Sequence, residues 1–264
     1  MASHQTLDVT RDGAAVTILL NRPQALNAWN EQLGLDLRQA LSSIAGDPEA
    51  RAVMITGAGR AFSSGADLKE QRTDDGGGPP DLSQRLRELY NPSILAIREM
   101  PKPVIAAVNG PAVGIGCSLA LACDLVLAAE SAYFLLAFVN IGLIPDGGVT
   151  ATGPARAGFA RATEMAMLGE RVPARQALDW GLANRVHPDD QLLGAATELL
   201  GHLAAGPTAS YANAKRLLNR RLLAGLGDQL EAEADAQREQ GRTADFVEGV
   251  IAFAEKRPAT FTGA

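Results

Sequence analysis

Three short runs of almost wholly apolar residues constrain the fold of this chain most strongly. They are Ala52–Thr56, Val104–Val108 and Leu125–Ala129, and each has the length of a strand rather than of a helix. A strand that is apolar at every position buries both of its faces, as the strands of parallel sheets do. A helical pattern over Leu82–Ile97 separates the first two runs. The sequence therefore predicts an α/β fold in which buried parallel strands alternate with helices.

The beginning of the chain fits the same plan. Ala15–Asn21 is typical of a strand and ends at a turn signal, Arg22-Pro23. Leu33–Ile44 then carries apolar residues at helical spacing. Later helical patterns cover the segments Ala162–Leu168, Ala174–Trp180 and Gln191–Ala205.

The last part of the chain contains no plausible strand. Thr208–Glu255 is helical in pattern, with one break at Gly225-Leu-Gly227. We therefore expect a βα-built core that carries the site over residues 1–205 and an all-helical region over residues 206–264. An amphipathic helical region that follows a complete core must bury its apolar face, and a neighbouring subunit is a common partner. A homo-oligomer is the expected result.

Composition argues against several classes of partner. The net charge is −6, with 47% hydrophobic and 20% charged residues, as in an ordinary globular enzyme. A nucleic-acid interface would need clustered Lys and Arg. No apolar run approaches the ~20 residues of a membrane span, and the N-terminus lacks the apolar stretch of a signal peptide. We expect a cytoplasmic protein that binds neither nucleic acid nor membranes.

Two cysteines, Cys117 and Cys123, lie in an apolar segment. Their number and spacing favour neither a disulfide framework nor a metal site. No metal site is expected.

Two glycine-rich turns are the first candidates for chemistry. Gly59–Lys69 follows the strand pattern at Ala52–Thr56, and Asn109–Ser118 follows the one at Val104–Val108. The start of a helix after such a turn leaves backbone N–H groups without partners, and these can bind a negative oxygen. The first turn alone could equally be a tight βα connection in which Gly65 only permits a positive φ.

The glycine spacing of the second turn, at Gly110, Gly114 and Gly116, is not that of a dinucleotide-binding fingerprint. Two turns in one small domain that each direct an N–H group outward suggest instead a pair of donors on one oxygen. That is the geometry of an oxyanion hole.

Asp146 is the third candidate. It lies in an apolar neighbourhood, after Ile144-Pro145 and before Gly147-Gly148 and an expected helix. One interpretation makes it the N-cap of that helix. The other makes it a base, because an apolar environment raises the pKa of a carboxyl group.

The segment Gln71–Asp81 contains three glycines, two prolines and several charges. Such a composition cannot form part of a core, so we expect a mobile surface loop.

Taken together, these blocks resemble the crotonase (enoyl-CoA hydratase/isomerase) superfamily in order and spacing, over nearly the whole chain. The matching segments are Leu20-Asn-Arg-Pro23 with Asn27, Ala61–Asp67, Pro101–Gly110, Cys123-Asp124, Gly142–Pro145 and Glu255–Pro258.

The resemblance implies a fold, a ligand and a site. The fold is a crotonase-type spiral of ββα units with a C-terminal all-helical trimerisation region, present as a trimer or a dimer of trimers. The ligand is an acyl-CoA thioester, whose coenzyme A is part of the substrate, so that no separate cofactor is needed. The oxyanion hole would consist of the N–H groups of Ala66 and Ile115, bound to the thioester carbonyl.

Departures from the hydratase pattern bear on the activity. Hydratases of the superfamily carry two glutamates that activate water, at positions that correspond here to Ser118 and Phe138. Neither side chain is basic near neutral pH. Asp146 stands where hydratases tend to have glycine. In this the chain is similar to the ring-epoxide isomerases of phenylacetate catabolism, which form an oxepin, and to the enoyl-CoA isomerases.

We therefore expect an isomerase with Asp146 as the single acid and base. A crotonase-type hydratase or lyase and a non-catalytic acyl-CoA-binding subunit are the alternatives. For four of the expected substrate contacts a purely structural role stays open. Lys69 could be a solvated lysine, Lys256 a helix-end lysine beside a packed Phe253, and Tyr90 a core aromatic. The expected contacts with the substrate are Ser64, Gly65, Ala66, Asp67, Leu68, Lys69, Tyr90, Gly114, Ile115, Phe138, Phe253 and Lys256.

Overall fold

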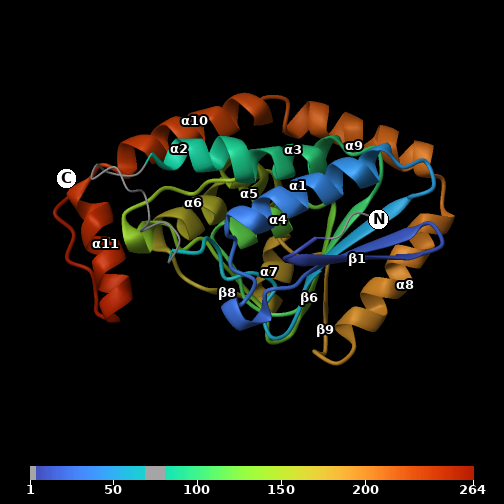
Figure 1. Ribbon diagram of the computed structural model, residues 1–264, viewed down its shortest axis with the longest axis horizontal. Helices are drawn as coiled ribbons and strands as arrows, with labels where there is room; N and C mark the ends of the chain where they lie inside the picture. The colour runs from blue at the N-terminus through green and yellow to red at the C-terminus, as the bar shows by residue number, and fades with distance from the viewer. Residues whose placement is uncertain (1–3, 69–80) are drawn as a thin grey trace.

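The computed structural model describes residues 4–68 and 81–264 (Figure 1). Lys69 and the predicted mobile loop, except for its last residue, lie outside the described residues. That last residue, Asp81, begins a helix, because its side chain accepts a hydrogen bond from the N–H of Ser83 at 3.0 Å.

A six-stranded sheet forms the centre of the molecule, in the order β1-β2-β3-β4-β6-β9. Neighbouring strands are parallel except for the antiparallel β1–β2 pair at one edge. The three apolar runs are the interior strands β3, β4 and β6, and all residues of β3 and β4 are buried. The predicted parallel α/β core is confirmed. The strands are β1 (Leu7–Asp12), β2 (Ala15–Leu20), β3 (Ala52–Gly57), β4 (Val104–Val108), β6 (Leu125–Ala129) and β9 (Arg185–His187).

A small second sheet, in the order β5-β7-β8, lies beside the site. It consists of β5 (Ala112–Val113), β7 (Tyr133–Leu135) and β8 (Val172–Pro173). The sequence pattern indicated neither these strands nor β9, because two or three residues are too few to show a strand period. Strand β1 was not predicted either, since it is an edge strand with mainly exposed polar residues.

Helices cover both faces of the large sheet. In Figure 1, α8 lies on one side of the strands, and α1 and α4 lie on the other. The expected helix over Leu82–Ile97 is present, but a π-helical turn, η3 (Leu86–Tyr90), interrupts it. Among the described residues, no helix combines the length and the apolar character that a bilayer crossing requires.

The helices before the C-terminal region are α1 (Glu31–Gly46), α2 (Leu82–Arg85), α3 (Asn91–Glu99), α4 (Ile115–Ala122), α5 (Val149–Ala157), α6 (Phe159–Leu168), α7 (Ala174–Trp180) and α8 (Leu192–Ala205), with the 3₁₀ turns η1 (Pro23–Ala25) and η4 (Val139–Ile141).

The C-terminal region consists of α9 (Thr208–Leu222), α10 (Leu226–Gln240) and α11 (Ala244–Glu255). The break between α9 and α10 was predicted. A second break, at Gly241–Thr243, was not predicted. The expectation of one uninterrupted helix from the first break to Glu255 was therefore wrong. Thr243 ends the connection by accepting a hydrogen bond from the N–H of Phe246 at 3.1 Å, a serine/threonine-type N-cap.

The C-terminal helices pack against their own core. In Figure 1, α9 and α10 form a layer over α3 and α2. Helix α11 contacts η4 closely, since a Cβ atom added to Gly249 would lie 2.6 Å from the backbone of Ile141. A side chain at that position would therefore push α11 away from η4.

A buried lysine ties α9 to the core. The Nζ atom of Lys215 donates to Asp124 Oδ2 at 2.8 Å, to the carbonyl of Ile97 at 2.6 Å and to that of Lys102 at 3.2 Å. The Arg98 guanidinium binds the other oxygen of Asp124 at 3.0 Å. All three donor positions of the Lys215 ammonium group are thus used within the protein.

We predict that Lys215→Met lowers the free energy of unfolding by about 3 kcal/mol, because it leaves buried acceptors without their donor. Urea unfolding at a fixed protein concentration measures this change. Lys256→Met is the matched control, since Lys256 is exposed, and should change stability by less than about 0.5 kcal/mol. Equal stabilities for the two variants would contradict the prediction.

Candidate active site

A cavity of about 960 Å³ lies where the two glycine turns, the small sheet and the C-terminal helices meet. Most of the predicted site residues line it. Lys256 does not, since it is the exposed C-cap of α11. The predicted residues in the lining are Ser64, Gly65, Ala66, Asp67, Leu68, Tyr90, Gly114, Ile115, Phe138, Asp146 and Phe253.

Backbone hydrogen bonds join the two glycine turns to each other. The N–H of Ser63 donates to the carbonyl of Pro111 at 3.0 Å, and the N–H of Val113 donates to the carbonyl of Ser63 at 2.9 Å. Gly65 has a φ of +95°, and a Cβ atom there would lie only 3.0 Å from the Val113 carbonyl oxygen. The contact between the turns therefore requires glycine at position 65.

These contacts leave two N–H groups at the cavity. Trp29 forms a parallel bridge with Ala66, in which the N–H of Trp29 donates to Gly65 and that of Asp67 donates to Trp29. The N–H of Ala66 is not used by this bridge and has no acceptor among the described residues. Ile115 is the first residue of α4, so its N–H has no acceptor within the helix. Two such donors can stabilise a negative oxygen.

Asp146 is buried, with 4% of its surface exposed, although it lines the cavity. Burial raises the pKa of its carboxyl group to about 8; a hydrogen bond from Gln237 opposes this rise, and the nearby Glu233 carboxyl adds to it. Oδ2 accepts the hydrogen bond from Gln237 Nε2 at 2.8 Å. Oδ1 has no hydrogen-bond partner in the described part of the chain. Asp146 thus has one carboxylate oxygen, itself buried and without a hydrogen bond among the described residues, in the residue set that lines the cavity with the two backbone donors.

The interpretation of Asp146 as a helix cap is wrong. Helix α5 begins at Val149, and its N-cap position is Gly148. Glu233 of α10 performs the capping instead, because its carboxylate accepts hydrogen bonds from the N–H groups of Gly148 at 2.7 Å and Thr150 at 3.2 Å. This leaves the Asp146 side chain free of a capping role.

The two positions at which hydratases were expected to carry glutamate have other tasks here. The Ser118 hydroxyl is buried and donates to the backbone carbonyl of Asp146 at 2.6 Å. The Phe138 ring lies against the second glycine turn, since a Cβ atom on Gly114 would be 3.8 Å from its Cζ. Ser118 therefore holds the Asp146 backbone, and Phe138 forms an apolar wall of the cavity.

Sequence reasoning missed the polar residues of α10 that surround Asp146. Glu233 and Gln237 are four residues apart and so lie on the same face of α10, and both are buried. Their only signal was a position beside the apolar residues Leu230 and Ala234 in an otherwise charged helix. Asp67, which was expected to contact the substrate, lines the cavity, and its carboxylate is paired with Arg22 at 3.0 Å.

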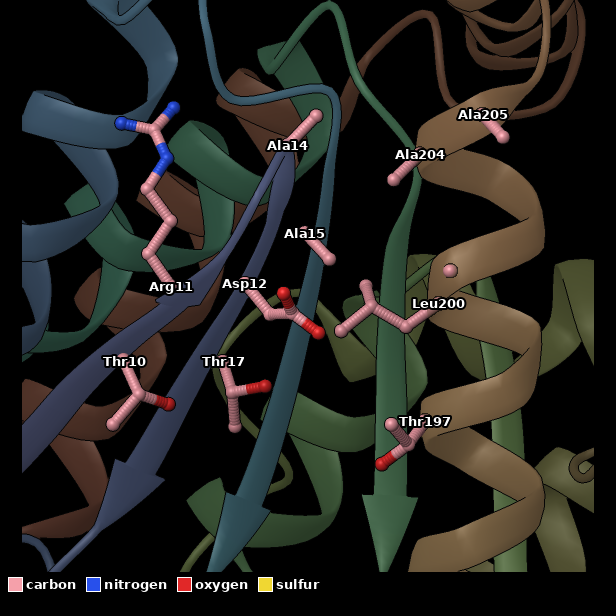
Figure 2. Close-up of a pocket in the computed structure, with 11 residues that line it drawn as sticks. Thr10, Arg11, Asp12, Ala14, Ala15, Thr17, Thr197, Leu200, Ala204 and Ala205 are labelled. Carbon is pink, nitrogen blue, oxygen red and sulfur yellow. The ribbon is translucent and has the colours of Figure 1, made fainter.

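A second, smaller cavity of about 450 Å³ lies between the β1–β2 hairpin and α8 (Figure 2). Its lining contains none of the predicted site residues. Figure 2 shows the Arg11 side chain pointing away from α8, and its guanidinium binds Asp47 at 2.9 Å. Besides Arg11, the lining includes the carboxylate of Asp12 and the hydroxyls of Thr10, Thr17 and Thr197.

The raised pKa of Asp146 predicts a dependence of stability on pH. The folded protein holds a proton that the unfolded chain releases between pH 3.8 and about 8, so the contribution of this group to stability falls as the pH rises through that range. Relative to the wild type, Asp146→Asn should therefore gain at least about 1 kcal/mol of stability between pH 5 and pH 9. Urea unfolding at the two pH values tests this. A difference that does not change with pH would show that the carboxyl titrates normally.

Comparison with known proteins identifies the family. The family described as enoyl-CoA hydratase/isomerase matches residues 10–264. The chain is 43% identical to 1,2-epoxyphenylacetyl-CoA isomerase of Escherichia coli K12, over 94% of this chain and 95% of that protein. It is 44% identical to a probable enoyl-CoA hydratase of Rhodobacter capsulatus, over 100% of both.

A solved structure shows the same fold. The crystal structure of an enoyl-CoA hydratase from Mycobacterium avium subsp. paratuberculosis covers 98% of this chain, with a TM-score of 0.89 and 40% sequence identity. The predicted crotonase-type fold is thereby confirmed. The family match over residues 10–264 and the shared fold show that the chain belongs to the enoyl-CoA hydratase/isomerase family, whose fold is that of crotonase.

Proposed function

We propose that this protein is an isomerase of acyl-CoA thioesters in which Asp146 is the single acid and base. The observation that carries the proposal is the pairing of one buried carboxylate, with a free Oδ1, and two backbone N–H groups in one cavity. The similarity to the E. coli 1,2-epoxyphenylacetyl-CoA isomerase supports it.

For a 3-enoyl thioester the chemistry is as follows. The Asp146 carboxylate takes a proton from the carbon next to the thioester, and the electron pair moves onto the carbonyl oxygen to give a dienolate. The N–H groups of Ala66 and Ile115 bind that oxygen. The protonated carboxyl then returns the proton to the γ-carbon, so that the double bond moves into conjugation and the composition of the substrate is unchanged.

One carboxyl group suffices for this reaction because the proton that it takes is the proton that it returns. A pKa of about 8 suits both steps near neutral pH, since neither the acid nor the base form is strongly disfavoured. The rearrangement of a ring epoxide to an oxepin is the second substrate class that we propose for the same site, on the basis of the E. coli relative. Coenzyme A is part of the substrate in both cases.

Hydration of an enoyl-CoA is the alternative that the relatives support, because the Rhodobacter protein is named a probable enoyl-CoA hydratase. Addition of water needs a group that holds and activates it, and Ser118 and Phe138 supply no carboxylate for this task. Turnover of crotonyl-CoA would favour the hydratase, and turnover of a 3-enoyl-CoA would favour the isomerase. Tight binding of both without turnover would indicate a non-catalytic acyl-CoA-binding subunit.

Asp146→Asn should lower the isomerase rate by at least about 100-fold, because proton transfer by a positioned group contributes about 10²–10⁴-fold. Asparagine preserves the shape of the side chain and cannot accept the proton. Single-turnover kinetics with a 3-enoyl-CoA measure the rate, and calorimetric binding of a saturated acyl-CoA serves as the control and should change little. A variant that retains more than about a tenth of the rate would exclude Asp146 as the only base.

We also propose a trimer-based homo-oligomer. Apolar side chains stay exposed on α9 at Leu217, Leu218 and Leu222, and on α6 at Phe159 and Met167. Exposed apolar surface of this kind marks protein–protein contacts.

Sedimentation velocity at low micromolar concentration should give a mass three or six times that of the 27.6 kDa chain. Leu218→Arg should shift the distribution to smaller species, because it places a charge in the proposed contact. Glu198→Arg on α8, which is also exposed, is the control and should leave the mass unchanged. A stable monomer of the intact protein would contradict the proposal.

A further inference from the structure

We propose that Gln237 of α10 is a positioning residue for Asp146, which it holds so that Oδ1 is the oxygen that exchanges the proton with the substrate. The inference rests on the proposed function, since it concerns the base of that reaction. It extends the site to α10, since Gln237 lies 91 residues after Asp146 in the chain.

The neighbours of Gln237 determine the orientation of its amide group. The amide oxygen, Oε1, accepts a hydrogen bond from the N–H of Ile144 at 3.2 Å. The amide nitrogen, Nε2, donates to the carbonyl of Ile144 at 2.9 Å and to Asp146 Oδ2 at 2.8 Å. A flipped amide would place Oε1 against two acceptors and Nε2 against a donor. The observed orientation is therefore the one that satisfies every group.

This clamp distinguishes the two carboxylate oxygens of Asp146. Gln237 is 1% exposed and Asp146 is 4% exposed, so water does not compete effectively for the hydrogen bond between them. With Oδ2 bound to Gln237 and the backbone carbonyl of Asp146 held by Ser118 at 2.6 Å, the carboxylate has little freedom to rotate. Oδ1 alone is then available to a substrate proton, which is the arrangement that a positioned base needs.

Gln237 also affects the charge of the base. Its N–H donates to the carboxylate and so favours the ionised form, whereas Glu233, one turn earlier on the same face of α10, opposes it by repulsion. Glu233 is itself held at the start of α5. The other charged or titratable groups that face the cavity are Arg22, Asp67, Arg85, Tyr90, Tyr133 and Arg257.

The first test is Gln237→Met, which keeps the length of the side chain and removes the donor. Carbon-13 NMR of labelled aspartate in the free protein, assigned with Asp146→Asn, follows the ionisation of the carboxyl directly. Loss of one hydrogen bond to a charged group should raise the pKa of Asp146 by about one pH unit. The acidic limb of the kcat/KM profile should move by the same amount, with about a tenfold loss of kcat/KM on that limb.

Gln240→Met is the matched control on the same helix, since the side chain of Gln240 makes no hydrogen bond within the described residues. It should leave the NMR titration and the pH profile unchanged. If Gln237→Met does not fold, Gln237→Glu replaces it, because the shape is the same. The two adjacent carboxyls should then titrate in two coupled steps, with the upper step above the wild-type value.

Unchanged titration of Asp146 in Gln237→Met, or independent titration in Gln237→Glu, would overturn the inference even if Asp146 is essential for turnover. A shifted titration together with an unaltered acidic limb of kcat/KM would also overturn it. If the titration shifts and the wild type isomerises no 3-enoyl-CoA or ring-epoxide thioester, the proposed function fails while the contact of Gln237 with Asp146 stands.

Discussion

The site depends on two backbone hydrogen bonds that join the first glycine turn to the second. Ser63 donates to Pro111 and accepts from Val113, and the absence of a side chain at Gly65 lets the backbones approach. This junction joins the turns that follow the paired strands β3 and β4, and the N–H groups of Ala66 and Ile115 lie at one cavity. Backbone donors held in this way need no rearrangement when an oxygen becomes negative, which is why they suit an enolate.

The proposed acid–base group, Asp146, is held by other parts of the chain. Ser118 of α4 holds the backbone of Asp146, and Gln237 of α10 holds its side chain. Glu233 caps α5 and so takes over the task that an aspartate before a helix would ordinarily have. Because three residues share these tasks, Asp146 is buried and one of its carboxylate oxygens has no hydrogen bond in the part of the chain that the structure describes.

The same burial has an energetic consequence. A carboxyl with a pKa of about 8 costs folding free energy when it is ionised, because its charge is poorly solvated. The hydrogen bond from Gln237 compensates only part of that cost. A site of this kind therefore lowers the free energy of unfolding, but it supplies a group that can both accept and return a proton near neutral pH.

Much of the fold and of the site could be predicted from the sequence, because both depend on local patterns. The apolar runs at Ala52–Thr56 and Val104–Val108 identified buried parallel strands, and the glycines that follow them identified the turns with the backbone donors. Asp146 stood out as a carboxylate among apolar residues. The short strands β5, β7, β8 and β9 did not stand out, since hydrogen bonds to neighbouring segments define them rather than any period of their own.

Only the tertiary structure decided that Asp146 does not cap α5 and which residues hold its backbone and its carboxylate. An aspartate before a helix has the local signal of a cap, and that signal was overruled by Glu233, which arrives from α10. Gln237 looks like any polar residue of a charged helix until α10 packs against α2 and α5. The sequence by itself determined which groups could react, because their chemistry and the turns around them depend on short segments of the chain. The residues that contact these groups are distant from them in sequence, and only the packing of the folded chain brings them together.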